Sequence, residues 1–397
     1  KKDRLFTLAD QWKIPVVFFT EGGGGRPGDD VEGAGLDCMA FHLWGKLSGS
    51  VPLIGIASGR CFAGNAAILG CCDVVIATKG ANIGMGGPAM IEGGGLGVFS
   101  PDEVGPVQDQ YSNGVVDILV DNEAEAVKIA KKYISYFQGP LKSWSCQDQR
   151  ILRTLIPENR LRSYNVREVI TAIADSESVL ELRRGWGRAI VTAFVRIEGM
   201  AIGVIANNPL FLGGAIDAVG SDKSARFMQL CNSFGIPLLF LCDTPGFMVG
   251  LDSEKDGMVR HCSRLFVTGA NLTVPTMTII LRKSYGLGAQ AMAGGSHKVP
   301  MFVVSWPTGE IGGMGLEGAI KLGFRKELEA VEDSGERKEL FDKLVAAAYE
   351  RGSCLNAASG FEIDDVIDPK DSRHLIVRAL ETADCNNFSR RNFVDSY

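Results

Sequence analysis

The sequence lacks several features that would each assign it to a common class of protein. No apolar run approaches the length of a membrane-spanning helix, and the longest, such as residues 236–242, has the length of a strand. The GxxxxGK[ST] motif of P-loop proteins does not occur. The ten cysteines include no CxxC pair and no cluster with histidine at zinc-ligand spacing. We therefore expect a chain without a membrane span or a metal site, with buried, reduced thiols.

The chain also lacks an excess of basic residues. It carries 41 Lys and Arg against 47 Asp and Glu, for a net charge of −6, which argues against nucleic acid as the main partner. No signal peptide is visible, so we expect a cytoplasmic location. The hydrophobic content of 46% over 397 residues suffices for two or three packed domains. Forty-nine glycines without a period indicate a turn-rich α/β enzyme.

Hydrophobic periodicity predicts alternating helices and strands. The helix-like segment at residues 5–12 leads straight into a strand at 14–19 that is predicted to be buried, which suggests a first domain truncated at its N-terminus. His42 is predicted to lie in the core on the apolar side of a helix. The clearest predicted elements are a helix at 36–47, a buried strand at 51–57, a second strand at 71–78, an amphipathic helix at 123–137 and a hairpin at 189–197 and 201–206.

The segment SGRCFAGN (residues 58–65) stands between the buried strand and a second apolar run at 66–69. The chain therefore runs from strand through a tight turn into a helix. Such a turn aims the backbone N–H groups of Ala63, Gly64 and Asn65 at one point, where the helix dipole adds positive potential. The arrangement suits an anion, and especially the oxyanion of a thioester-derived enolate.

An internal repeat indicates two related domains. Ile14-Pro15 and Val51-Pro52 open two successive strands, and Ile236-Pro237 and Val274-Pro275 do the same in the second half. The separations are 37 and 38 residues, and each second strand leads into a small-residue turn. The turn in the second half is YGLGA (residues 285–289).

The run GRCFAGNAAILGCCDVVIATKGANIGMG resembles the crotonase superfamily, whose members hold acyl-CoA thioester oxygens in an oxyanion hole. Within it, residues 19–26 resemble the FxxxGGxR segment of biotin-dependent acyl-CoA carboxyltransferases, and residues 220–250 match that family nearly position for position. The resemblance implies an α/β fold of two tandem crotonase-like domains built from β-β-α spiral units. We expect an acyl-CoA domain at 1–139, a linker at 140–164 and a biotin domain at 165–397.

The resemblance implies that CO2 moves from carboxybiotin to the α-carbon of an acyl-CoA through an enolate held by backbone donors. Ala63 and Gly64 would supply the acyl-CoA hole, and Leu287 and Gly288 the biotin hole. His297, near the predicted biotin site, is a weak further candidate. The resemblance assigns cofactor and substrate binding to Arg26, Gly59, Asn65, Gly246, Phe247, Tyr285, Gly286 and Ala289.

The family also implies partners. Neither a biotin-accepting MKM motif nor an ATP-grasp segment occurs, so biotin must arrive on another domain or subunit, with biotin carboxylase and biotin carboxyl carrier as partners. We expect a hexamer built from three dimers, in each of which the first domain of one subunit faces the second domain of its partner. Gln290, where short-chain members have aspartate, and the charged segment 324–351 resemble single-chain, long-chain acyl-CoA carboxylases of fatty acid metabolism.

Two alternatives stay open. An ordinary crotonase hydratase or hydrolase needs carboxylates as general acid and base, but the segment that usually carries one reads IGMGG (residues 83–87). Glu92 lies five residues further on, where a solvated loop glutamate is the simpler interpretation. A related decarboxylase subunit would share both turns and run the reaction backwards, and the sequence does not separate it from a carboxylase.

Overall fold

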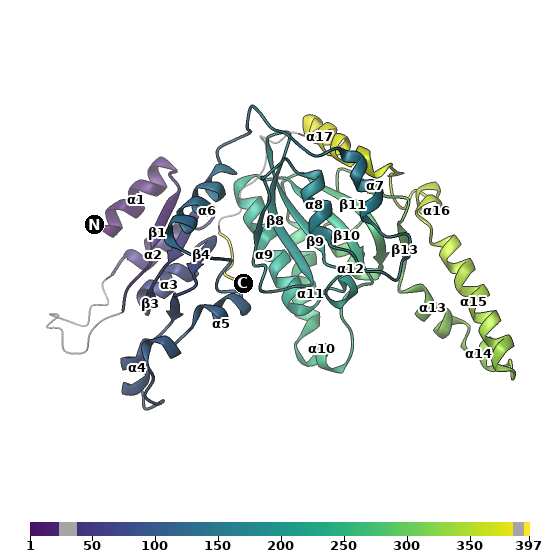
Figure 1. Cartoon of the computed structure of the whole chain (residues 1–397), viewed down its shortest axis with the longest axis horizontal. Coiled ribbons are helices and arrows are strands. Elements are labelled where there is room, and N and C mark those ends of the chain that lie inside the picture. Colours follow the sequence, from purple (N-terminus) through teal and green to yellow (C-terminus); the bar gives the residue numbers. More distant parts are fainter. Residues whose placement is uncertain (24–37, 384–392) are drawn as a thin grey trace.

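The structure is a computed structural model that describes residues 1–23, 38–383 and 393–397. The first half holds a parallel four-stranded sheet in the order β1-β2-β4-β6 (Val16–Phe19, Leu53–Ala57, Val74–Thr78, Ile118–Val120). Alternate side chains of β2 enter different cores, because successive residues of a strand face opposite ways. Leu53 and Ala57 join α1 (Lys2–Trp12) and α2 (Ala40–Leu47), whereas Ile54 and Ile56 join α6 (Glu123–Ser135). The sheet is therefore covered on both faces (Figure 1).

The second half holds an eight-stranded sheet, in the order β14-β12-β11-β10-β9-β8-β7, with β13 paired to the end of β11. Its strands are parallel from β14 to β9, and an antiparallel hairpin of β8 and β9 continues it to β7. The strands are β7 Leu180–Leu182, β8 Ile190–Ile197, β9 Met200–Asn207, β10 Leu238–Thr244, β11 Thr276–Tyr285, β12 Val303–Ser305, β13 Glu310–Gly312 and β14 Asp365–Val366.

The two halves repeat one topology. In the first, β1 pairs with β2, β2 with β4 and β4 with β6, while the short β3 (Arg60–Phe62) pairs with β5 (Asn82–Gly84). In the second, β10 pairs with β11, β11 with β12 and β12 with β14, while the end of β11 pairs with β13. Helix α3 (Gly64–Gly70) follows β3, and α12 (Gly286–Ala291) follows β11. The two small-residue turns therefore occupy equivalent places.

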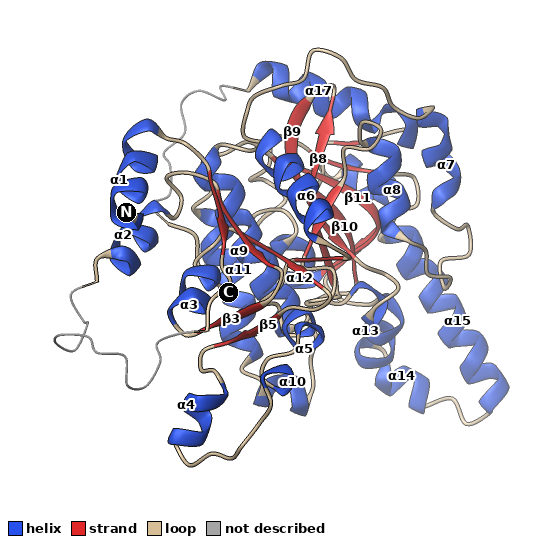
Figure 2. Ribbon diagram, turned by 60° about the vertical axis from the view of Figure 1, so that its left-hand side comes forward, coloured by secondary structure: helices blue, strands red, loops and turns tan. Residues whose placement is uncertain are grey.

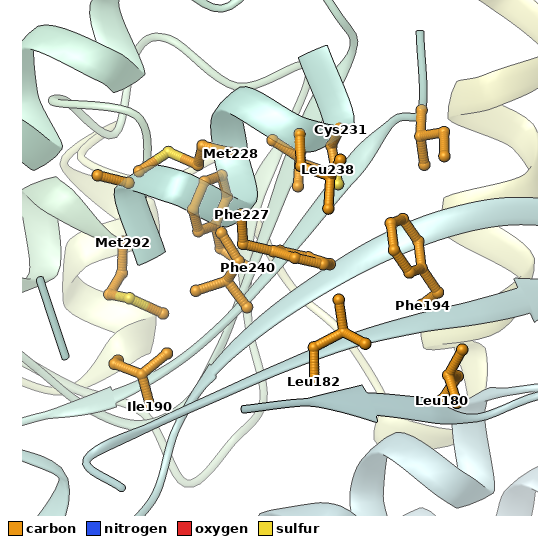
Figure 3. Packing of buried hydrophobic residues seen from close by; sticks show 14 of the residues in the cluster. Leu180, Leu182, Ile190, Phe194, Phe227, Met228, Cys231, Leu238, Phe240 and Met292 are labelled. Carbon is orange, nitrogen blue, oxygen red and sulfur yellow. The ribbon is translucent and has the colours of Figure 1, made fainter. Parts of the chain in front are cut away.

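A single hydrophobic core joins the two sheets. Helix α9 (Ala218–Phe234) is buried along nearly its whole length and contributes Phe227 and Met228 to a cluster that also contains Ile54 of the first sheet and Phe194 of the second. Figure 3 shows Phe194, Phe227 and Phe240 side by side in this cluster. Tyr133 of α6 meets Phe194 edge-on, with ring centroids 5.7 Å apart. The two halves thus bury apolar side chains in one common core. The domain limits expected from the sequence stay a prediction.

The remaining helices cover the outer faces of the second half. Helices α7 (Leu152–Leu155), α8 (Val166–Ile173) and α17 (Ser372–Thr382) pack on the face of the second sheet opposite α9, and α11 (Met258–Ala270) packs against α9. Helices α13 (Leu316–Gly323), α14 (Arg325–Glu329) and α15 (Ser334–Arg351) form an arm that projects from the body in both views (Figures 1 and 2). Across the residues placed by the structure, no helix combines the length and the hydropathy needed to cross a membrane.

Several predicted elements are confirmed, and two predictions about burial are wrong. The helix at 123–137 and the hairpin at 189–206 appear as α6 and β8–β9. The strand predicted to be buried at 14–19 is instead β1, at the edge of its sheet, where Val17 and Phe19 are 38% and 52% exposed. His42 is exposed on α2, because Trp44 and Leu47 make up the buried face of this short helix.

Buried ionic contacts join the halves where α9 meets the first sheet. Arg226 donates to the carbonyls of Cys72 and Asp73, at 3.0 and 2.9 Å, and Arg183 pairs with Asp117 at 3.0 Å. Lys223, also on α9, is buried and donates to the carbonyls of residues 183, 186, 187 and 190 at 2.8 to 3.4 Å. These contacts fix the chain that enters the second sheet.

We predict that Lys223→Met lowers the free energy of unfolding by about 3 kcal/mol, because the carbonyls of residues 183, 186, 187 and 190 each lose the hydrogen bond from the Lys223 ammonium, and those of residues 186 and 190 keep no other donor outside the strand ladder. The matched control is Lys128→Met on the exposed face of α6, which should change stability by less than about 0.5 kcal/mol. Urea unfolding followed by circular dichroism measures both. Equal effects of the two substitutions would contradict the stabilising role of the Lys223 hydrogen bonds.

Burial lowers the pKa of Lys223 from 10.5 to about 7. Between these values the unfolded chain binds the proton that the folded chain has released, so raising the pH favours the folded state. We therefore predict that the stability of the wild type relative to Lys223→Met increases as the pH rises from about 7 towards 10. A difference that stays constant over this range would show that Lys223 keeps its proton.

Candidate active site

The first turn, residues 58–65, leads from β2 through β3 into the N-terminus of α3. Ala63 has φ 54° and ψ −124°, a backbone conformation that few residues other than glycine adopt, and it precedes the first residue of α3, Gly64. No side chain caps this helix. The amides of Gly64 and Asn65 find no acceptor among the described residues, as expected for the first turn of a helix.

The structure changes the predicted role of Ala63. Its amide donates to the carbonyl of Gly84 at 3.1 Å, at the end of the β3–β5 pair, and so is not free to bind another acceptor. Sequence reasoning missed this bond because Gly84 lies in a different strand, 21 residues away. Of the two donors predicted here, only Gly64 has a free amide, with Asn65 next to it.

Asn65 ties the turn to the loop that follows β1. Its side-chain amide donates to the carbonyls of Thr20 and Glu21 at 3.1 and 2.8 Å, and Glu21 in turn accepts from the amide of Ser58 at 2.5 Å. A Cβ on Gly22 would lie 2.3 Å from this side chain, so only glycine fits there. Asn65 therefore positions the turn through its side chain.

The structure gives no specific role at the first turn to the other two predicted residues, Gly59 and Arg26. Gly59 has ordinary φ, and a Cβ added there would meet only the Glu21 side chain, at 3.6 Å, so the backbone does not require glycine. Arg26 lies outside the described residues. Beside the turn, Gly87 contacts the ring of Phe62, and α4 (Pro88–Gly93) and its flanks expose Met85, Met90 and Leu96. This side of the first turn is open and apolar.

The second turn, residues 285–289, leads from β11 directly into α12. Gly286 has φ 58°, and a Cβ there would lie 2.8 Å from the carbonyl oxygen of Gly313. The amides of Leu287 and Gly288 have no acceptor within the part of the chain that the structure describes, and no side chain caps α12. The side chain of Leu287 is exposed. Both predicted donors are therefore available.

Gly288 permits a close approach of two backbones. A Cβ on Gly288 would lie 2.8 Å from both Cα and C of Gly246 and 3.1 Å from the amide nitrogen of Phe247. Gly246 itself has φ 125°, and Thr244 Oγ1 accepts from its amide at 3.1 Å. The loop after β10 therefore lies directly against the N-terminal end of α12, which brings Gly246 and Phe247 together with Leu287 and Gly288.

A cavity of about 530 Å³ lies beside the second turn. Gly286 and Ala289 line it, and so do His297 and Gln290. Charged and polar side chains that were not predicted from the sequence complete the cavity wall: Lys298, Arg351, Asn356 and Glu362. They come from separate segments, and α15 and α16 (Cys354–Ser359) supply two of them, so no local motif could have indicated them.

Two titratable groups near the second turn are held neutral. Burial lowers the pKa of His297, which keeps the imidazole uncharged near pH 7. Tyr285 is buried and donates its hydroxyl to Glu310 at 2.9 Å, and burial raises the pKa of Tyr285. The Tyr285 ring packs with Leu316 and Ile320 in an apolar cluster, and Tyr285 is not among the residues that line the cavity.

The two turns lie apart within one chain. Figure 1 shows α3 and α12 on different sides of α9 and α11. Within the described residues, no group of three or more His, Cys, Asp or Glu side chains is placed to hold a metal ion. Each turn instead offers backbone amides and small residues, a combination that can stabilise a negative charge developing on an oxygen atom.

Comparison with known proteins identifies related chains. The carboxyl transferase domain family matches residues 1–392. The biotin-dependent acetyl-/propionyl-coenzyme A carboxylase beta6 subunit of Mycobacterium bovis is 31% identical over 394 residues, which cover 98% of this chain and 83% of that protein.

Two solved structures are also similar. A single-chain, multi-domain long-chain acyl-CoA carboxylase superimposes with a TM-score of 0.90 at 58% identity, covering 95% of this chain. The chain spans only 37% of the length of that protein. Transcarboxylase 12S, a hexamer whose structure was solved with methylmalonyl-coenzyme A and methylmalonic acid bound, superimposes with a TM-score of 0.86 at 32% identity, covering 98% of this chain and 76% of that one.

We predict that Gly288→Ala lowers the free energy of unfolding by about 2 kcal/mol, because its Cβ would overlap the backbone of Gly246. Gly323→Ala is the control, since a Cβ there meets nothing within 4 Å. It should change stability by less than about 0.5 kcal/mol. A Gly288→Ala variant as stable as the control would mean that the loop does not approach α12 this closely.

Proposed function

Since the chain belongs to the carboxyl transferase domain family, we propose that it is the carboxyltransferase component of a biotin-dependent acyl-CoA carboxylase. The observation that carries the proposal is the pair of equivalent strand-to-helix turns, each with free backbone amides, in a chain of this family. One turn would hold the acyl-CoA and the other biotin. Such a division requires two anion-stabilising sites in one protein, which the repeated topology provides.

At the first turn, the amides of Gly64 and Asn65 would hold the thioester oxygen as the acyl-CoA becomes an enolate. A donor already in place stabilises this charge without reorganisation, and each such donor contributes about 3 kcal/mol to lowering the barrier. Helix α3 carries no ionisable side chain in the sequence GNAAILG. The turn therefore offers positioning and charge stabilisation rather than a side-chain base.

At the second turn, the amides of Leu287 and Gly288 would hold the ureido oxygen of biotin. Biotin, when bound, supplies the carboxyl group that is transferred. The residues fit such a ring: the amides have no acceptor among the described residues, the loop at Gly246 lies directly against Gly288, and polar side chains line the adjacent cavity of about 530 Å³. The neutral His297 adds no charge to this wall.

The separation of the turns supports an assembly in which two copies complete each site. The exposed apolar side chains beside the first turn, Met85, Met90 and Leu96, are 64% to 75% exposed and would be covered by a second copy. We propose a hexamer built from such dimers; transcarboxylase 12S is likewise a hexamer. Biotin carboxylase and biotin carboxyl carrier domains would deliver biotin, in keeping with the multi-domain relative.

An ordinary crotonase hydratase is less well supported. Such an enzyme needs carboxylates at the substrate, yet α3 has none, the Glu21 carboxylate beside the turn accepts from the amide of Ser58, and Glu92 is exposed on α4. A decarboxylase that uses the same two turns differs only in direction. The assay below measures carboxyl transfer from a malonyl-type CoA, a step that a decarboxylase and a carboxylase running in reverse both catalyse.

We predict that the intact protein containing this chain releases CO2 from malonyl-CoA or an alkylmalonyl-CoA only when free biotin is added. Replacing Gly64 with proline removes one amide at the first helical position and should lower kcat about 100-fold. Gly64→Ala adds the same Cβ beside Phe41 but keeps the amide, and should retain most of the activity.

Both variants are first shown to unfold at the wild-type urea concentration. Turnover without biotin would contradict carboxyl transfer. Equal losses in the proline and alanine variants would contradict the role of the Gly64 amide and point to the added side chain.

A further inference from the structure

The side chain of Asp243 is fully buried at the end of β10 and is surrounded by cations from the next strand. Arg282 Nη2 lies 3.1 Å from Oδ2, and Lys283 Nζ lies 3.7 Å from Oδ1. The amide of Lys283 also donates to Oδ1 at 3.1 Å. Oδ2 receives no hydrogen bond from the described residues, so its burial is compensated mainly by the charge of Arg282.

The main chain of Asp243 and the side chain of Lys283 hold the segment that follows the neighbouring strand β9. Asn207, at the end of β9, accepts from the amide of Asp243 at 3.1 Å and donates to Gly214 at 3.3 Å. Lys283 reaches over to the carbonyl of Gly213 at 2.5 Å. The segment after β9 is therefore fastened to β10 and β11 through Asp243 and its neighbours.

The loop that follows Asp243 is held in turn by that segment. Ile216 donates to the carbonyl of Gly246 at 3.0 Å and accepts from Met248 at 2.8 Å. Thr244 Oγ1 closes the loop by accepting from the amide of Gly246. Since Gly246 and Phe247 lie against Gly288, this loop connects Asp243 to the N-terminal end of α12.

We propose that Asp243, through its buried pair with Arg282, is a positioning residue for the second turn, setting the distance between the 244–248 loop and the free amides of Leu287 and Gly288. The proposal deepens the proposed function, because these amides are the ones assigned to biotin. Asp243 does not line the cavity and acts through the backbone it holds.

The chain offers a matched control for the substitution. Asp117 is equally buried and pairs with Arg183 at 3.0 Å, but it lies between the first sheet and α9. Asp117→Asn and Asp243→Asn therefore remove the same charge from the same kind of pair. Only the second pair adjoins the loop against α12.

The experiment measures amide hydrogen exchange in the intact protein, which needs no activity. In Asp243→Asn, exchange in residues 244–248 and 286–291 should increase about tenfold relative to strand β8. In Asp117→Asn, these two segments should keep their wild-type exchange relative to β8. A uniform increase across the chain in Asp243→Asn, or no increase at the second turn, would overturn the proposal.

Steady-state kinetics then connect positioning to biotin. Asp243→Asn should raise KM for free biotin about tenfold and change KM for the acyl-CoA less than about twofold. Equal changes in both constants would overturn the link to the biotin turn. A wild type without biotin-dependent turnover would refute the proposed function, while the exchange data would still decide whether Asp243 positions the second turn.

A milder variant covers the case in which Asp243→Asn does not fold. Lys283→Met removes the ammonium contacts to Asp243 and Gly213 from a partly exposed side chain, without leaving a buried charge unpaired. It should increase exchange in the same two segments by a smaller factor. Unchanged exchange in Lys283→Met would also contradict the proposal.

Discussion

The second turn depends on how closely two backbones approach at the end of the second sheet. Gly288 leaves no room for a side chain between the loop after β10 and the start of α12, and Gly246 has a positive φ of 125° that favours glycine in this loop. Because the helix begins there, its first amides have no partner in the described part of the chain. The same absence of side chains that makes the contact possible therefore leaves the donors accessible. The chemistry of this site is carried by the main chain, and side chains serve to hold it in place.

The two sheets are built so that such turns occur twice. Equivalent strands pair in the same order in each half, and α9 lies between the halves in one shared core (Figure 3). The buried contacts of Arg183, Lys223 and Arg226 fix the halves to each other. This rigid connection keeps the turns apart in one chain, and it is the physical reason for proposing that a second copy brings a first turn against a second turn.

Much of the fold could be predicted from the sequence, because periodicity reports which face of an element is buried. The helix at 123–137, the hairpin and the repeated strands were predictable in this way. Sequence reasoning failed where the partner is distant. It assigned a free amide to Ala63, which Gly84 occupies, and it gave no sign of the pairing of Asp243 with Arg282 or of Arg351 and Glu362 in the cavity wall. Edge position, which exposes Phe19, is likewise decided by strand order.

The most direct test of the central claim is amide hydrogen exchange in the intact protein with each ligand in turn. We predict that free biotin slows exchange in residues 286–291 and leaves exchange in residues 64–70 unchanged. A non-hydrolysable acyl-CoA analogue should do the opposite, slowing exchange in residues 64–70 and leaving exchange in residues 286–291 unchanged. Protection of one segment by both ligands, or of neither segment by either ligand, would contradict the assignment of one turn to each substrate.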